Sequence, residues 1–71
     1  MIIYTEHAEE RVARRFIKKE WVEKVVKNPD ELIGAKYDRK QAIKKINSEE
    51  VSVIYVKEDS NFIVITVFWG R

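Results

Sequence analysis

The sequence is poor in residues that form covalent cross-links or bind metals: among 71 residues there is no cysteine and a single histidine. Without cysteine the chain has no disulfide, no thiolate zinc site and no cysteine nucleophile. One histidine excludes a metal site built from several imidazoles. Only carboxylates are left as metal ligands, and we expect the chain to use neither a metal nor another cofactor.

Long apolar runs and a marked excess of one charge are also missing. No run is long enough to span a bilayer, and the opening MIIYTEHAEE lacks the basic and then apolar pattern of a signal peptide. We therefore expect a cytoplasmic protein with no membrane partner. Fourteen lysines and arginines oppose twelve aspartates and glutamates, which gives a net charge of +2. That excess alone does not indicate nucleic-acid binding, which would depend on where the charges lie.

The residues that are abundant indicate one small globular domain over 1–71. Hydrophobic residues make up 45% of the chain and charged residues 37%, a composition that supports folding but sits near the lower size limit for a self-sufficient core. We therefore expect a homodimer, formed through an edge strand or through the end that carries Trp69. The frequent lysine, glutamate, valine and isoleucine are typical of thermophile proteins.

Two amphipathic segments predict two helices near the N-terminus. In the first, Ala8, Val12 and Phe16 share one stripe, which we expect to be buried. The second is KKEWVEKVVKNP, whose asparagine and proline end the helix. The apolar stripe of the first helix does not continue in phase into the second, so the chain must turn near Ile17 to Lys19.

After Pro29 the pattern changes to short extended runs, namely ELIGAKYD, RKQAIKKI, VSVIYVK and NFIVITVFW. They predict a meander in which the last two runs are central and the lysine-rich run is a half-exposed edge strand. MIIYT is either a further short strand or an extended lead-in. The predicted fold is α+β, with two N-terminal helices packed on one face of an antiparallel sheet of about four strands.

The polar face of the first helix carries the histidine. At about 100° per residue, Arg11 lies about 40° from His7 on one side and Arg14 about 20° on the other, with Arg15 at the border of the apolar stripe. This face suits chemistry on a phosphate, because an imidazole moves protons and guanidinium groups hold anions. It equally suits an ordinary solvated helix surface, with Arg14 paired to Glu10.

The stretch TEHAEERVARRF, the helix pair and the late strand with VITVF together resemble the family called domain of unknown function 4258. The matching positions are His7, Ala8, Arg11, Arg15 and Thr66, and the resemblance extends over nearly the whole chain. One departure is FIKK, where the family often has a small polar cap, so the second helix begins without a capping side chain. The helix-then-sheet layout is in turn similar to the RelE-type toxins, small α+β domains that cleave RNA without a metal.

This resemblance implies a metal-independent RNA endonuclease of the toxin type, with catalytic His7, Arg11 and Arg15 and with RNA and a cognate antitoxin as partners. The alternative is a non-catalytic module that binds nucleic acid or a protein, in which His7 caps or packs the helix start. A single histidine cannot serve a two-histidine mechanism. The candidates for a second proton-transfer group are the lysines and Glu6, Glu10, Tyr4, Tyr37 and Tyr55.

Four further residues are candidates for nucleic-acid contacts, namely Arg14, Arg39, Lys45 and Thr66. For the basic residues of the lysine-rich strand, the alternative is protection of an edge against sheet aggregation. For Thr66 it is an ordinary β-branched strand position. Trp69 either stacks on a base or closes a small core or a dimer contact.

Overall fold

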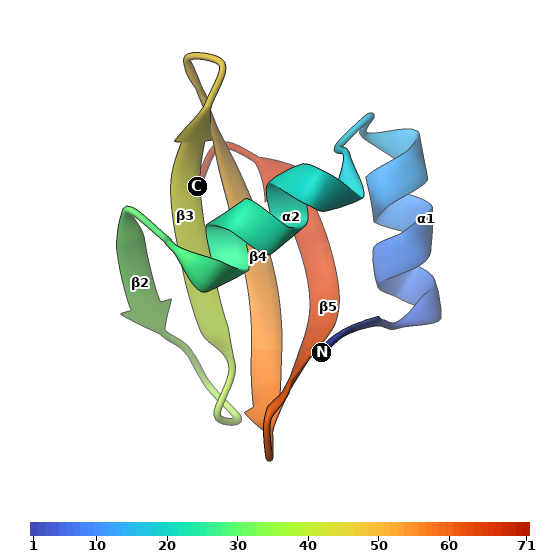
Figure 1. The fold of residues 1–71 in the computed structure, drawn as a ribbon, viewed down its shortest axis with the longest axis vertical. Helices are drawn as coiled ribbons and strands as arrows, with labels where there is room; N and C mark the ends of the chain where they lie inside the picture. Colours follow the sequence, from blue (N-terminus) through green and yellow to red (C-terminus); the bar gives the residue numbers. More distant parts are fainter.

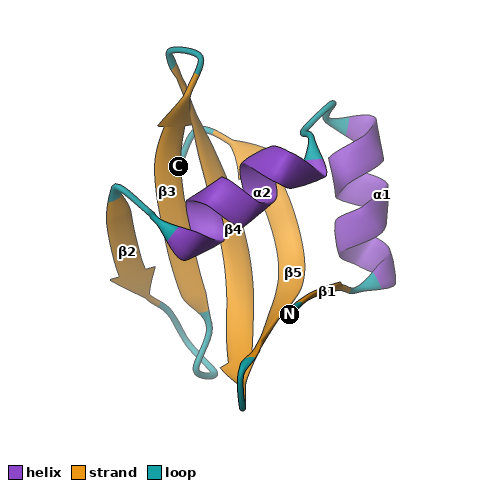
Figure 2. Ribbon diagram, viewed as in Figure 1, coloured by secondary structure: helices purple, strands orange, loops and turns teal.

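A computed structural model describes all residues, 1–71, and places two helices among five strands (Figure 2). The fold is therefore α+β, as the change in periodicity after Pro29 predicts. In chain order the elements are β1 (Ile2–Tyr4), α1 (Glu6–Arg14), α2 (Lys19–Lys27), β2 (Glu31–Gly34), β3 (Lys40–Ile46), β4 (Glu49–Glu58) and β5 (Asn61–Trp69).

The strands form one mixed sheet in the order β1-β5-β4-β3-β2. β1 pairs with β5 in parallel, and the remaining neighbours are antiparallel. The expectation of about four antiparallel strands is thus corrected to five strands, because MIIYT contributes a strand beside β5. The central positions predicted for β4 and β5 are confirmed. The edge position predicted for the lysine-rich β3 is wrong, because β2 pairs with its outer side.

The break between the helices is a Schellman motif around Phe16. The amide of Ile17 donates to the Val12 carbonyl at 3.1 Å and the amide of Phe16 donates to the Ala13 carbonyl at 3.4 Å, and Phe16 has a φ of 55°. The motif turns Ile17 into the core and Phe16 out of it. The turn between the helices is therefore as predicted, but the burial predicted for Phe16 is wrong, since this residue is 84% exposed.

The two helices differ in how they begin. Thr5 caps α1, because its hydroxyl oxygen accepts from the Ala8 amide at 3.1 Å. α2 starts after Lys18 with no side-chain cap, which the FIKK stretch predicts.

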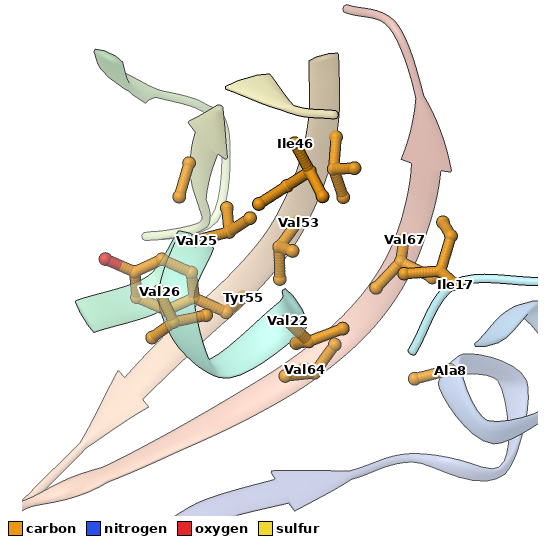
Figure 3. Packing of buried hydrophobic residues seen from close by; sticks show 12 residues of the cluster. Ala8, Ile17, Val22, Val25, Val26, Ile46, Val53, Tyr55, Val64 and Val67 are labelled. Carbon is orange, nitrogen blue, oxygen red and sulfur yellow. The ribbon is translucent and has the colours of Figure 1, made fainter. Parts of the chain in front are cut away.

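α2 lies across one face of the sheet, over β3 and β4 (Figure 1). Its buried residues Val22, Val25 and Val26 point toward the valines of the strands beneath (Figure 3). Burial of this kind contributes on the order of 1.5–3 kcal/mol for each large aliphatic side chain. The core cluster consists of Ala8, Ile17, Val22, Val25, Val26, Ala42, Ile46, Val51, Val53, Tyr55, Val64 and Val67.

α1 lies beside β5, where β1 ends, and contacts these two strands (Figure 1). Polar groups at both ends of α1 bond the otherwise unpaired edge of β5. Thr5 donates from its amide to the Val64 carbonyl at 3.2 Å and from its hydroxyl to the Ile65 carbonyl at 3.3 Å. No helix of the chain is both long and apolar enough to cross a membrane.

Candidate functional site

An open pocket of about 650 Å³ lies between α1 and the last residues of β5. Four of the predicted site residues meet there, three from the helix and one from the strand. The two aromatic residues that follow Thr66 complete the lining. The lining residues are His7, Arg11, Arg15, Thr66, Phe68 and Trp69.

The helical part of the pocket follows from a spacing of four residues. Positions four apart advance by about 40° around a helix, so His7, Arg11 and Arg15 form a slowly turning row along one side of α1 and its C-cap. Arg14 does not line the pocket; its Nη2 lies 3.9 Å from the Glu10 carboxylate, and its side chain is 67% exposed. The row therefore contains Arg15 and not Arg14. The helical phase predicted the reverse, with Arg14 beside His7 and Arg15 at the border of the apolar stripe.

His7 is exposed and bonded to a side chain rather than to backbone. The Nε of Arg11 donates to His7 Nε2 at 3.3 Å. A nitrogen that accepts a hydrogen bond carries no proton, so this geometry fits the imidazole tautomer whose proton is on Nδ1. The pocket thus contains an imidazole lone pair directly beside a guanidinium group.

Arg15 has a structural contact as well as a place in the pocket. Its Nη1 donates to the Val67 carbonyl at 2.9 Å, on the edge of β5 that β1 leaves open. That bond uses one of the five N–H groups of a guanidinium. The carbonyl of Arg15 in turn accepts from Trp69 Nε1 at 2.8 Å. Arg15 therefore fixes the end of α1 to β5 and still presents its charge to the pocket.

The strand side of the pocket depends on the alternation of β5. Val67 belongs to the core beneath the helices, so Thr66 and Phe68 point to the opposite face of the sheet. Trp69 packs edge-to-face on Trp21, with ring centroids 5.9 Å apart, and is 37% exposed. Trp69 therefore packs on Trp21 and keeps part of its ring exposed, and its stacking on a base stays a prediction. Phe68 was missed in the sequence, although its spacing from Thr66 was the available signal.

Two predicted nucleic-acid contacts lie elsewhere. Arg39 belongs to the turn before β3, where its amide bonds the Lys36 carbonyl at 3.2 Å. The amide of Lys45 donates to Asp30 at 2.9 Å. Neither residue lines the pocket, so any contact that they make with nucleic acid is separate from the His7 site.

The pocket holds one side chain suited to proton transfer, because arginine stays protonated and threonine does not titrate. The tyrosines considered as a second group are placed elsewhere. The hydroxyl of Tyr4 is buried without a hydrogen-bond partner, and its pKa is raised by burial and by the nearby Glu23 and Glu9 carboxylates. Burial likewise raises the pKa of Tyr55, which lies in the core. No group of three or more histidine, cysteine, aspartate or glutamate side chains is placed to hold a metal.

Fold and pocket together define a small α+β domain with one histidine and two arginines in an open pocket beside a sheet edge. The chain belongs to the family described as domain of unknown function (DUF4258), whose model matches residues 4–69. That range includes every residue that lines the pocket. No curated protein and no solved structure shows a significant match to the chain.

Proposed function

We propose that the protein is a metal-independent RNA endonuclease in which Arg11 and Arg15 bind the phosphate to be cleaved and His7 is the general base. The observation that carries this proposal is the contact between Arg11 Nε and His7 Nε2 in an open pocket. It places a proton acceptor next to the group that holds the anion, which is the arrangement that attack on a phosphodiester needs.

The charge of the pocket favours a phosphate. Arg11 and Arg15 contribute two permanent positive charges, and guanidinium groups match phosphate oxygens in geometry. The nearest acid is Glu10, whose carboxylate lies 3.8 Å from Arg11 Nη1 and whose side chain is 55% exposed. A pair at that distance and exposure contributes little, so an incoming phosphate replaces it at small cost.

The cleavage step uses the 2′-hydroxyl of RNA as the nucleophile. His7 Nε2 accepts the hydroxyl proton, the 2′-oxygen bonds to phosphorus, and the bond from phosphorus to the 5′-oxygen breaks. The leaving 5′-oxygen takes a proton from solvent, which reaches the open pocket, and His7 returns its own proton to water. The products are a 2′,3′-cyclic phosphate and a 5′-hydroxyl, and the two arginines stabilise the charge that develops on the phosphate oxygens.

The hydrogen bond from Arg11 to His7 requires phosphate binding to precede proton transfer. While Arg11 donates to Nε2, the lone pair of His7 is occupied. A phosphate is a stronger acceptor for a guanidinium than a neutral imidazole is, because the bond is between opposite charges. Phosphate binding therefore draws Arg11 away and frees Nε2 for the 2′-hydroxyl.

RNA is favoured over a small phosphorylated molecule because the pocket is open and has aromatic side chains beside its cations. Phe68 and Trp69 offer rings to a base, and stacking combined with basic side chains is the usual mode of single-strand binding. The layout of two helices before the main sheet is consistent with the resemblance to RelE-type toxins, which adds support by analogy. A cognate antitoxin as partner rests on this analogy alone.

The experiment is incubation of the purified protein with single-stranded RNA in excess chelator, followed by analysis of the product ends. We expect cleavage with 2′,3′-cyclic phosphate and 5′-hydroxyl ends, and equal cleavage by Lys27→Ala, a matched control that removes an exposed cation on α2, where Lys27 pairs with Glu23. RNA binding without cleavage would support the non-catalytic alternative. Absence of both binding and cleavage would contradict RNA cleavage and RNA binding, and would leave the module that binds a protein.

A further inference from the structure

Phe16 combines a left-handed backbone with a large exposed aromatic side chain, as Tyr37 does in the turn before β3. It occupies the residue after the C-cap of α1 with a φ of 55°, in the left-handed region that glycine commonly fills at this position. Its side chain is 84% exposed although it is a large aromatic. A glycine would make the same turn without backbone strain and without an apolar ring in water.

The ring of Phe16 is therefore not part of the buried core. The Schellman hydrogen bonds come from backbone groups, and the buried residue of the motif is Ile17, which is 2% exposed. Strained residues of this kind that persist against local preference are concentrated at binding and catalytic sites. The ring is thus a candidate for a contact with a ligand.

Phe16 is adjacent to the His7 pocket. The carbonyl of Arg15, which forms the peptide bond to Phe16, accepts from Trp69 Nε1 at 2.8 Å. The side chain of Arg15 lines the pocket together with Trp69. The bond to the Trp69 indole thus fixes the peptide link before Phe16 at one border of the pocket.

The surroundings of Phe16 are basic. The local sequence is RRFIKK, in which Ile17 is buried and the side chain of Arg14 is 67% exposed. The ammonium group of Lys18 lies 5.4 Å from the ring centre of Trp21. An exposed ring in a basic segment of the chain differs from a protein-binding hot spot, which lies within a packed patch whose rim excludes water. It matches the combination of stacking and positive charge found at single-stranded nucleic-acid sites.

We propose that Phe16 is a stacking platform for an unpaired base of single-stranded RNA, next to the nucleotide whose phosphate occupies the His7 pocket. This inference rests on the proposed function. The substrate class is then narrowed to unpaired RNA, because a base inside a duplex is stacked on its neighbours and its face is not available to the ring.

The test compares Phe16→Gly and Phe16→Tyr with the unmodified chain. The probe is a short fluorescent single-stranded RNA with 2′-O-methyl groups, which block cleavage, and the readout is anisotropy. Phe16→Gly should weaken binding about 5- to 150-fold, the range for loss of one stacked base, whereas Phe16→Tyr should bind as the unmodified chain does. Since glycine suits the left-handed turn, the melting temperature of Phe16→Gly should rise, so unfolding cannot explain weaker binding.

A second probe with an abasic site at each position in turn locates the contact. One position should lower the affinity of the unmodified chain and leave the affinity of Phe16→Gly unchanged. Equal affinity of Phe16→Gly and the unmodified chain for the intact RNA would overturn the inference and would leave Phe16 to a protein partner. Cleavage of RNA by both chains in that case would show that the proposed function stands without this contact.

Discussion

At the scale of single residues, the polar side chains of α1 that line the pocket differ in their contacts with the rest of the fold. His7 and Arg11 contact each other on the surface of α1, in an exposed hydrogen bond. Arg15 instead bonds the Val67 carbonyl in a partly buried contact. Arg15 therefore has two roles, the proposed phosphate binding and a structural hydrogen bond. Comparison of substitutions at Arg15 and Arg11 distinguishes the two.

Arg11→Ala and Arg15→Ala should differ in stability and agree in activity. Arg15→Ala leaves the Val67 carbonyl without its donor, which costs on the order of 1–3 kcal/mol of unfolding free energy. Arg11→Ala should change it by less than about 0.5 kcal/mol. Each should remove about 2–4 kcal/mol of transition-state stabilisation. Urea unfolding and initial cleavage rates measure the two effects. Equal stability of the two variants would contradict the structural role given to Arg15.

At the scale of elements, sequence periodicity predicts the turn between the two helices but not the residue at which the first helix ends. The change of phase between the two amphipathic stripes required a turn, and the turn is present. The stripe also predicted that Phe16 is buried, because it continued the helical spacing by one residue too many. Neither glycine nor proline stands at this junction, so no local signal marks the end of the helix at Arg14.

Replacement of Phe16 by glycine tests the junction itself. Phe16→Gly should raise the free energy of unfolding by about 0.5–1 kcal/mol, since glycine adopts the left-handed conformation without strain. The measurement is urea unfolding at neutral pH, with Phe16→Ala as a control that removes the ring but keeps the strained Cβ. A less stable Phe16→Gly chain would show that the ring contributes to the fold.

The sheet shows a second limit of sequence reasoning. β4 and β5 were predictable because they are long, apolar and β-branched. β1 pairs with β5 through only three residue pairs, whose members are about sixty positions apart in the chain. No local sequence pattern predicts which strand such a short strand pairs with. All four residues of β2 are exposed, so β2 has no buried side of the kind that an alternating sequence pattern predicts. Its position outside β3 could therefore not be predicted either. The site was more predictable than the sheet, because helical spacing alone places His7 and Arg11 together.

Asp30 lies in the loop between α2 and β2, and its carboxylate bonds β3. This contact makes the free energy of unfolding depend on pH. The Lys45 amide, with help from Lys44, lowers the pKa of the Asp30 carboxyl below its ordinary value of 3.8. A carboxyl with a lower pKa in the folded state stabilises the fold above the unfolded-state pKa and loses this effect as pH falls through the folded-state pKa.

The free energy of unfolding should therefore fall as the pH drops below about 3.8. Asp30→Asn should be less stable at neutral pH and show a smaller loss in acid. Chemical unfolding at several pH values measures both, with Asp38→Asn as a control in an exposed turn. An unchanged acid dependence in Asp30→Asn would contradict the role assigned to this carboxylate.

At the scale of the whole molecule, α2 covers one face of the sheet and no helix covers the other (Figure 1). The uncovered face carries partly buried apolar residues such as Ile54 and Phe68. At the β2 edge, Leu32 and Ile33 are 50% and 39% exposed. The homodimer expected from the small size of the core stays a prediction. Sedimentation equilibrium should show a dimer, and a monomer at high concentration would remove it.

His7→Ala is the variant that tests whether His7 is the proton acceptor of a metal-independent RNA cleavage site. Cleavage of single-stranded RNA in chelator and the melting temperature should be measured for His7→Ala beside the unmodified chain. We expect cleavage to fall by at least about 100-fold while the melting temperature is nearly unchanged, because the His7 side chain is exposed and its one hydrogen bond is to Arg11. A folded His7→Ala protein with undiminished cleavage, or one that fails to fold, would contradict this role of His7.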